Sequence, residues 1–166
     1  CVRRLAVNSR GFTLVEAMVT LAIMALVIAV TVPLTGGWVA SANRLDAQGA
    51  LTEAFGHARG AAIRNAMAAS ADSPVAKICL ESGELKVLQG TAVSAADCAS
   101  GAGKLVWQKN VNADVDITQD GSPYQCSCFN NRGLLTTVDC SGCGTEFTFT
   151  IATGTADDEK ETIVID

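Results

Sequence analysis

The hydrophobic pattern of this chain begins with an apolar run over residues 12–35, in which Glu16 is the single charged residue. As a helix, 24 residues extend about 36 Å, which is enough to cross the core of a typical bilayer. A carboxylate in such a segment costs roughly 2.5–3.5 kcal/mol on insertion scales, so we expect Glu16 to have a function and a partner. Pro33, Gly36 and Gly37 predict an interruption of the helix, as a kink or a locally unwound stretch.

A second pattern, with apolar residues at steps of three and four, covers the Ala-rich segment 38–69. Its apolar positions are Leu45, Leu51, Phe55, Ala58, Ala62, Ala66 and Met67, and polar positions around them are Arg44, Asp46, Glu53, Arg59 and Arg64. This spacing predicts an amphipathic helix over residues 36–69 that packs on its own globular domain.

After the small and polar linker 70–74, the pattern changes to short runs with strand chemistry. These runs cover residues 75–80, 84–88, 104–108, 111–118, 134–138, 147–152 and 162–165, and clusters of Gly, Asp, Asn and Ser separate them. Such spacing predicts antiparallel sheets. The predicted fold class is therefore α+β. A long N-terminal helix, membrane-spanning in its first half and amphipathic in its second, packs on a small antiparallel β domain over residues 70–166.

The charge changes sign along the chain. Residues 1–11 hold Arg3, Arg4 and Arg10 and no acid, whereas the remainder has nine basic and 17 acidic residues and a formal net charge of −8. A positive leader before a negative remainder fits the positive-inside bias, with the leader cytoplasmic and the rest translocated. Cys1 stands where Met is expected, which suggests a truncated or misassigned start, and we give it no function.

The junction of the leader and the apolar run carries a family resemblance. Its residues are Arg10-Gly11-Phe12-Thr13-Leu14-Val15-Glu16. The junction resembles the class III signal of type IV pilins and type II secretion pseudopilins. The resemblance implies that a prepilin peptidase cleaves between Gly11 and Phe12 and that the new amine of Phe12 is methylated. The apolar run is then kept as an anchor, unlike a secretory signal, which is cut after its apolar region.

The resemblance also implies a role for Glu16 and a set of partners. Glu16 would pair with the free amine of Phe12 in a neighbouring subunit, and leaving either charge alone in an apolar filament core is strongly unfavourable. The implied function is a structural filament subunit, held in the bacterial inner membrane with a periplasmic domain and then assembled into a pilus or pseudopilus. Its implied partners are other pilin or pseudopilin subunits, the prepilin peptidase and the inner-membrane assembly platform.

Three further segments resemble the GspH/FimT branch of minor pilins and pseudopilins. They are Ala58-Arg59-Gly60-Ala61-Ala62-Ile63-Arg64, the run 75–80 with Cys79, and the turn Phe129-Asn130-Asn131-Arg132-Gly133. Two alternatives stay open within this resemblance, a minor pseudopilin of type II secretion and a DNA-binding pilin of natural transformation. The charge of −8 disfavours DNA binding, which relies on phosphate neutralisation by basic residues. A local basic face would need Arg59, Arg64, Lys77, Lys104 and Lys109.

Six cysteines follow the leader: Cys79, Cys98, Cys126, Cys128, Cys140 and Cys143. An even number in a domain outside the cytoplasm predicts up to three disulfides, with 15 possible connectivities. We favour Cys79 with Cys98, and Cys126 and Cys128 with Cys140 and Cys143 across a hairpin-like turn. The alternative is a zinc site, since the latter four offer paired thiolates.

Other candidate chemistry is sparse. Asn112, Asp114, Asp116 and Asp120 place oxygen ligands close together, but their spacing misses the EF-hand pattern, and we favour a solvated turn over a calcium site. The acidic run 157–161 predicts an exposed charged turn. His57, the single histidine, has no assignable nucleophile or acid beside it and is interpreted as a surface or packing residue. The sequence therefore predicts neither an enzyme nor a cofactor.

Overall fold

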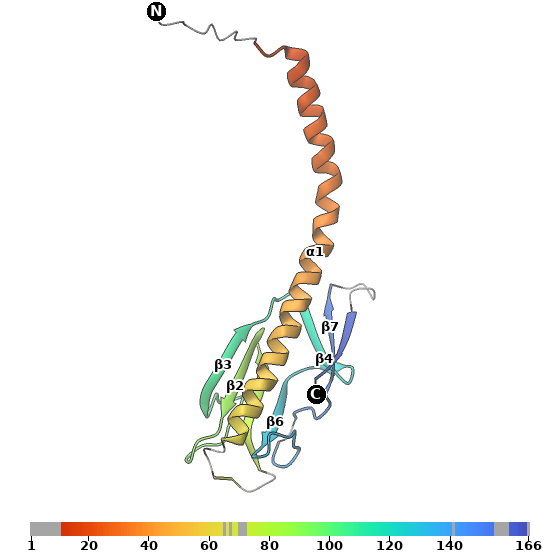
Figure 1. The fold of residues 1–166 in the computed structure, drawn as a ribbon. Helices are drawn as coiled ribbons and strands as arrows, with labels where there is room; N and C mark the ends of the chain where they lie inside the picture. Colours follow the sequence, from red (N-terminus) through yellow and green to blue (C-terminus); the bar gives the residue numbers. More distant parts are fainter. Residues whose placement is uncertain are drawn as a thin grey trace, which may run out of the picture. The chain divides into compact units, whose positions relative to one another are not determined.

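The computed structural model describes residues 11–64, 66, 68–69, 73–140, 142–154 and 160–165. The chain divides into two compact units, residues 1–39 and residues 40–166, and each is described by itself. Helix α1 (Leu14–Ile63) contributes to both units (Figure 1). The strands are β1 (Pro74–Glu81), β2 (Glu84–Gln89), β3 (Lys104–Asn110), β4 (Val115–Gln119), β5 (Ser122–Pro123), β6 (Cys126–Asn130), β7 (Thr148–Thr153) and β8 (Lys160–Val164).

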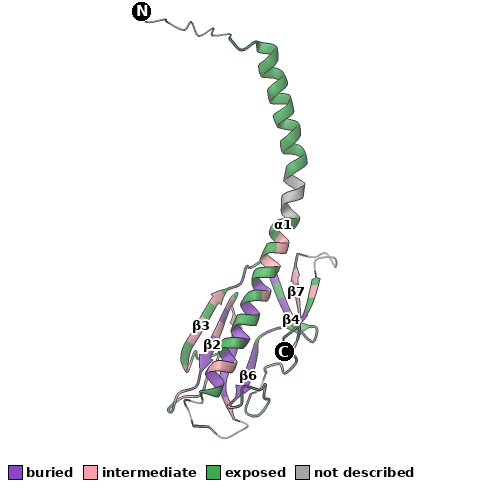
Figure 2. Ribbon diagram, in the orientation of Figure 1, coloured by how far each residue is buried: buried purple, intermediate pink, exposed green. Residues whose placement is uncertain are grey.

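In the first unit, α1 is an isolated apolar helix. Its stretch Leu14–Thr31 has a mean hydropathy of 2.4 and is long enough to span a membrane by length and composition. Figure 2 shows every described residue of this stretch as exposed. Burying an aliphatic side chain is worth about 1.5–3 kcal/mol, so a surface of Leu, Ile, Val and Met requires a cover of lipid or of other helices.

The predicted local unwinding at Pro33, Gly36 and Gly37 is wrong. The backbone of α1 is helical through residues 31–40. A proline inside a helix costs about 3 kcal/mol and a glycine about 1 kcal/mol. A helix of 50 residues tolerates these costs without losing its backbone pattern.

In the second unit, the part of α1 from residue 40 onward packs on two four-stranded antiparallel sheets. The strand orders are β3-β2-β1-β6 and β5-β4-β7-β8. The buried residues of α1 are Ala47, Ala50, Leu51, Ala54, Phe55, Ala58, Ala61 and Ala62. Phe55 lies edge-on against Phe129 of β6 and Phe149 of β7, with both pairs of ring centroids 5.4 Å apart. One side chain of α1 therefore joins the cores of both sheets.

Parts of the predicted helical stripe are wrong. Leu45 is 60% exposed, because it precedes Ala47 by about 200° of helical rotation and lies away from the buried face. Ala66 is also exposed, and Met67 lies outside the described residues. The helix ends at Ile63 rather than at residue 69. Tertiary contacts mark this end, since Gly133 packs so closely that a Cβ there would lie 3.3 Å from the Ile63 side chain.

Five of the seven predicted strands are confirmed within one or two residues at each end, and two predictions need correction. The predicted strand 111–118 begins only at Val115, as β4. The residues before it form a turn, in which the Asn112 carbonyl accepts a hydrogen bond from Val115 N at 3.0 Å. The run 134–138 is not a strand and makes only an isolated bridge, between Phe129 and Leu135. The sequence analysis missed β5 and also β6, whose five residues are all buried.

Candidate functional site at the N-terminus and the disulfide-bonded face

The start of α1 is defined by a side-chain cap. Thr13 Oγ1 accepts a hydrogen bond from Glu16 N at 3.2 Å, and Thr13 O accepts from Ala17 N at 3.1 Å. Thr13 to Glu16 thus has the spacing of a capping box, in which Ser or Thr precedes Glu by three residues. The sequence analysis missed this signal, which would have predicted that the helix begins at Leu14 rather than at Phe12.

Glu16 has a local electrostatic role in addition to any role in assembly. It lies in the first turn of α1, where a negative charge interacts favourably with the helix dipole. Its side chain is exposed, as is Phe12, at 74%. Within the described part of the chain, no ion pair of Glu16 is present. Glu16 is therefore accessible to a partner from another molecule.

All three disulfides lie on the face of the first sheet that points away from α1. The pairs are Cys79–Cys98, Cys126–Cys143 and Cys128–Cys140. The sequence analysis preferred the first pair and a link of Cys126 and Cys128 to Cys140 and Cys143, and it left the individual partners in that group open. In the register of this sheet, Cys79 of β1 is opposite Cys126 of β6, and Lys77 is opposite Cys128. The residues on the other face, such as Ile78 and Phe129, pack in the core with α1. The disulfides thus fasten loops to the face of the sheet that α1 does not cover.

The loop between β6 and β7 is held to β6 by backbone hydrogen bonds as well as by two disulfides. Cys128 O accepts from Thr136 N at 3.0 Å, and Cys126 O accepts from Gly144 N at 3.0 Å. Asn130 at the end of β6 also exchanges backbone bonds with Gly133 and Leu134. The described residues that follow β6, 131–140 and 142–144, are therefore attached to it through several backbone bonds as well as through their two cysteines.

The cysteines also make up the cluster of potential metal ligands found among the described residues. The sulfurs of Cys128, Cys140 and Cys143 lie within 4.8 Å of one another. In the disulfide form these sulfurs are not thiolates, and thiolates are what zinc binds. The structure therefore has disulfides in place of the alternative zinc site.

The oxygen-rich segment does not converge on one point. Asn112 Oδ1 accepts from Asp114 N at 2.9 Å, which uses this side chain in a local turn. Asp116 is exposed on β4, and Asp120 lies in the next turn with a φ of 50°. Among the described residues these side chains form no group with metal-ligand spacing. The solvated turn is the interpretation that this geometry favours.

The other residues singled out from the sequence lie at the surface. His57 is exposed, and its ring stacks on Trp107 with centroids 5.7 Å apart. Of the acidic run 157–161, residues 157–159 lie outside the described residues, whereas Lys160 and Glu161 begin β8. Glu161 forms an ion pair of 3.5 Å with Arg44 Nε, so this end of the run contacts α1.

The basic residues considered for DNA binding are mostly engaged within the domain. Lys77 pairs with Asp97 at 3.9 Å, and Lys109 pairs with Asp46 at 2.7 Å. The Arg59 guanidinium lies 5.8 Å from the ring centre of Phe147. The two remaining residues, Arg64 and Lys104, are exposed. Two of the five charges are thus neutralised in part by carboxylates, which weakens the case for a basic face.

The comparison with known families concerns the same N-terminal segment. Residues 7–32 match the family model of the prokaryotic N-terminal methylation motif. The chain carries the N-terminal signature of type IV pilins and pseudopilins. No curated protein and no solved structure matches the chain significantly. The signature lies on an apolar helix that leads into a helix-on-sheet domain, and this α+β arrangement is pilin-like. The motif therefore supports a type IV pilin or pseudopilin.

Proposed function

We propose that this protein is a minor pilin or pseudopilin of the GspH/FimT branch. It is a filament subunit that is processed by a prepilin peptidase and assembled by helix packing into a type IV pilus or its tip complex. The observation that carries the proposal is the methylation motif over residues 7–32, which lies on an apolar helix with no protein cover in its own unit. In a filament, the equivalent helices of other subunits supply that cover.

The position of the helix start supports the proposed processing. Cleavage between Gly11 and Phe12 leaves Phe12 as the first residue, directly before the capping residue Thr13. The new amine then lies at the positive end of the helix dipole, where the N–H groups already carry partial positive charge. A carboxylate of another subunit near this amine is favourable, and Glu16 is an exposed acid in the first turn.

Assembly through Glu16 and Phe12 follows from the same physics. In an apolar environment, the Phe12 amine and the Glu16 carboxylate each need a counter-charge, and an unmatched buried charge costs several kcal/mol. Pairing Glu16 of one subunit with Phe12 of its neighbour satisfies both groups and fixes the axial register of the two helices. Before assembly, the subunit is a single-pass inner-membrane protein with a cytoplasmic leader and a periplasmic domain, handled by the peptidase and the assembly platform.

A minor pseudopilin of type II secretion has the same helix chemistry, so this alternative differs only in the machine that it serves. DNA uptake is a second alternative, and it has less support. The formal charge without the leader is −8, and Lys77 and Lys109 are paired with acids of the same domain. A salt-dependent DNA shift assay with the detergent-solubilised protein tests it, since phosphate contacts weaken steeply with salt.

The experiment that tests the main proposal is co-expression with a prepilin peptidase, followed by intact mass measurement and N-terminal sequencing. We expect a product that begins at Phe12 and carries one methyl group on its amine. We also expect the unreduced product to be lighter than the reduced one by six hydrogen atoms, because three disulfides are present. An uncleaved chain in the presence of active peptidase contradicts the proposal and leaves only a membrane-anchored β domain.

A further inference from the structure

Two of the three disulfides form one sulfur cluster. Cys128 Sγ lies 3.9 Å from Cys143 Sγ, although Cys128 is bonded to Cys140 and Cys143 to Cys126. Reacting atoms in a near-attack geometry lie about 3–3.5 Å apart, and sulfur is larger than carbon, nitrogen or oxygen. Cys143 Sγ lies beside the Cys128–Cys140 bond, since the sulfurs of Cys128, Cys140 and Cys143 are all within 4.8 Å of one another. A thiolate at Cys143 is therefore close to Cys128 and must swing into line with this bond before it can displace Cys140.

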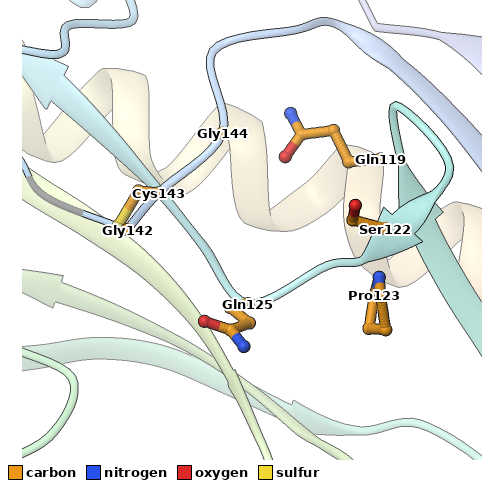
Figure 3. A pocket seen from close by; sticks show the side chains of 7 residues that line it. All are labelled: Gln119, Ser122, Pro123, Gln125, Gly142, Cys143 and Gly144. Carbon is orange, nitrogen blue, oxygen red and sulfur yellow. The ribbon is translucent and has the colours of Figure 1, made fainter.

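One sulfur of this cluster is accessible from outside. Cys143 is partly exposed, whereas Cys126, Cys128 and Cys140 are buried. Cys143 also lines a hollow of about 360 Å³. Figure 3 shows this hollow beside Gly142 and Gly144, with Gln119 and Gln125 on its other sides. An external thiolate in the hollow meets Cys143 first.

We propose that the Cys126–Cys143 and Cys128–Cys140 disulfides act as one redox unit. A dithiol reduces the Cys126–Cys143 bond, and the freed Cys143 thiolate then breaks the Cys128–Cys140 bond by thiol–disulfide exchange. One thiolate of the dithiol attacks Cys143 Sγ, and the electron pair of the broken bond leaves on Cys126, which takes up a proton. The second thiolate of the dithiol attacks its partner sulfur in the mixed disulfide. The dithiol leaves as a cyclic disulfide, and Cys143 is released as a thiolate.

The second step is an internal exchange without net oxidation or reduction. The Cys143 thiolate attacks Cys128 Sγ, and the Cys128–Cys140 bond breaks. The electron pair leaves on Cys140, which takes up a proton, and a new Cys128–Cys143 disulfide forms. Attack of the dithiol on Cys126 instead, through the neighbouring hollow that this residue lines, frees Cys143 directly and gives the same second step.

The fold keeps the four sulfurs together after the first bond opens. Gly144 N donates to Cys126 O at 3.0 Å, and Thr136 N donates to Cys128 O at 3.0 Å, independently of the sulfurs. Cys126 and Cys128 are also fixed on the same face of β6, two residues apart. The exchange is therefore intramolecular, and such reactions have effective molarities that favour them over attack by a second external thiol. The product still fastens the loop to β6, through one disulfide in place of two.

Partial reduction of the full-length protein carrying Cys1→Ser, which removes the seventh cysteine in the leader, tests the proposal in detergent. The protein is treated with limiting dithiothreitol, a dithiol, and the exposed thiols are blocked with N-ethylmaleimide at mildly acidic pH, which slows further exchange. Fragmentation mass spectrometry then assigns each label. Among the species with two labels in which Cys79–Cys98 is intact, we expect the labels on Cys126 and Cys140, with an intact Cys128–Cys143 bond. Labels on Cys126 and Cys143, with Cys128–Cys140 intact at every time point, overturn the exchange.

A matched pair of variants, made in the same Cys1→Ser background, gives a second readout that needs no reductant. Cys126→Ser leaves Cys143 as the free thiol, and we expect its single label to distribute between Cys143 and Cys140. Cys143→Ser leaves Cys126 as the free thiol and removes the attacking sulfur, so Cys140 should stay unlabelled. A label on Cys143 alone in Cys126→Ser, or equal labelling of Cys140 in both variants, contradicts the assignment of Cys143 as the exchanging sulfur. Neither readout depends on filament assembly.

Discussion

Gln89 of β2 donates a hydrogen bond from Nε2 to the backbone oxygen of Ala61, at 2.7 Å and fully inside the domain. Ala61 lies in the last turn of α1, where carbonyls have no partner within the helix. This bond therefore closes the end of the helix with a side chain from a strand 28 residues later.

The first prediction is that Gln89→Leu destabilises the domain by about 1–3 kcal/mol, because the Ala61 carbonyl is left buried without its partner. The measurement is urea unfolding of the detergent-solubilised protein, in which the midpoint urea concentration of the variant is compared with that of the unmodified protein. Gln125→Leu is the matched control, since Gln125 is exposed and should have little effect. Equal midpoints for the two variants contradict this role of Gln89.

Gly144 and Gln119 make a second long-range contact, which gives the second prediction. A Cβ at Gly144 would lie 1.8 Å from Gln119 Oε1, and Gln119 Nε2 donates to Glu146 O at 2.5 Å. Gly144→Ala must therefore displace the buried Gln119 side chain, and we expect a loss of about 1–3 kcal/mol. In a double-mutant cycle, Gly144→Ala in a Gln119→Ala background should cost clearly less. Additive costs indicate that the two residues do not interact in this way.

The third prediction concerns the pH dependence of the loop that carries Cys98. The Ser100 hydroxyl and backbone N–H both donate to Asp97 Oδ2, at 2.6 and 3.0 Å, and lower the pKa of this carboxyl. A carboxyl whose pKa is lower in the folded state stabilises that state above its unfolded pKa of about 3.9. This contribution is lost as the pH falls through the folded pKa.

An NMR titration of the Asp97 carboxyl carbon measures this effect. We expect its midpoint to lie below that of an ordinary Asp and to rise in Ser100→Ala, which removes the hydroxyl but keeps the backbone donor. Ser94→Ala removes a hydroxyl from the same loop that does not bind Asp97, and it serves as the control. A midpoint that is the same in Ser100→Ala and in the unmodified protein rules out the Ser100 hydroxyl as the cause.

The parts of the fold that follow from sequence are those set by local pattern. The apolar run, the Ala-rich helical face and most strands depend on periodicity within one segment, and the structure has them near the expected residues. The cysteine pairing was predicted only in part, because the sequence grouped Cys126 and Cys128 with Cys140 and Cys143 but did not fix the individual partners. The acid at Glu16 stands out from sequence alone because charged residues are rare in apolar helices.

The parts that sequence did not give are those fixed by distant contacts. The end of α1 depends on Gln89 and Gly133, which lie far along the chain, and no local stop signal marks Ile63. Strand β6 contains two cysteines and a serine, which resembles turn composition, yet burial against β1 and the loop makes it a strand. The position of Leu45 on the exposed side followed from helical phase, which a count of apolar residues does not resolve.

The fourth prediction tests the cleavage site. Gly11→Ala should leave the chain uncleaved by prepilin peptidase, because the family signal that this junction resembles has Gly before the cleaved bond. The space around Gly11 is open in the structure, so the substitution should not disturb folding. Asn8→Ala in the same leader is the control and should be processed normally. Normal processing of Gly11→Ala, judged by the mass of the product, shows that the bond is assigned wrongly.

The fifth prediction separates two roles of the first turn of α1. If Glu16 pairs with Phe12 of a neighbouring subunit, Glu16→Gln leaves that amine unmatched in the filament core, at a cost of about 3–5 kcal/mol. We expect the variant to be processed and inserted but to be absent from sheared filaments. The measurement is the ratio of filament to membrane protein by immunoblot, relative to the unmodified protein.

Thr13→Val is the matched comparison, because it removes the capping hydroxyl and leaves the charge of Glu16 unchanged. Loss of a helix cap costs about 1 kcal/mol, so this variant should assemble with a much smaller loss. If Glu16 acts only as a favourable charge at the start of the helix, Glu16→Gln costs about 0.3–1 kcal/mol, and the two variants assemble equally well. Equal assembly of the two variants would thus show that Glu16 stabilises only its own helix. It would contradict the proposal that Glu16 pairs with Phe12 of a neighbouring subunit and fixes the axial register.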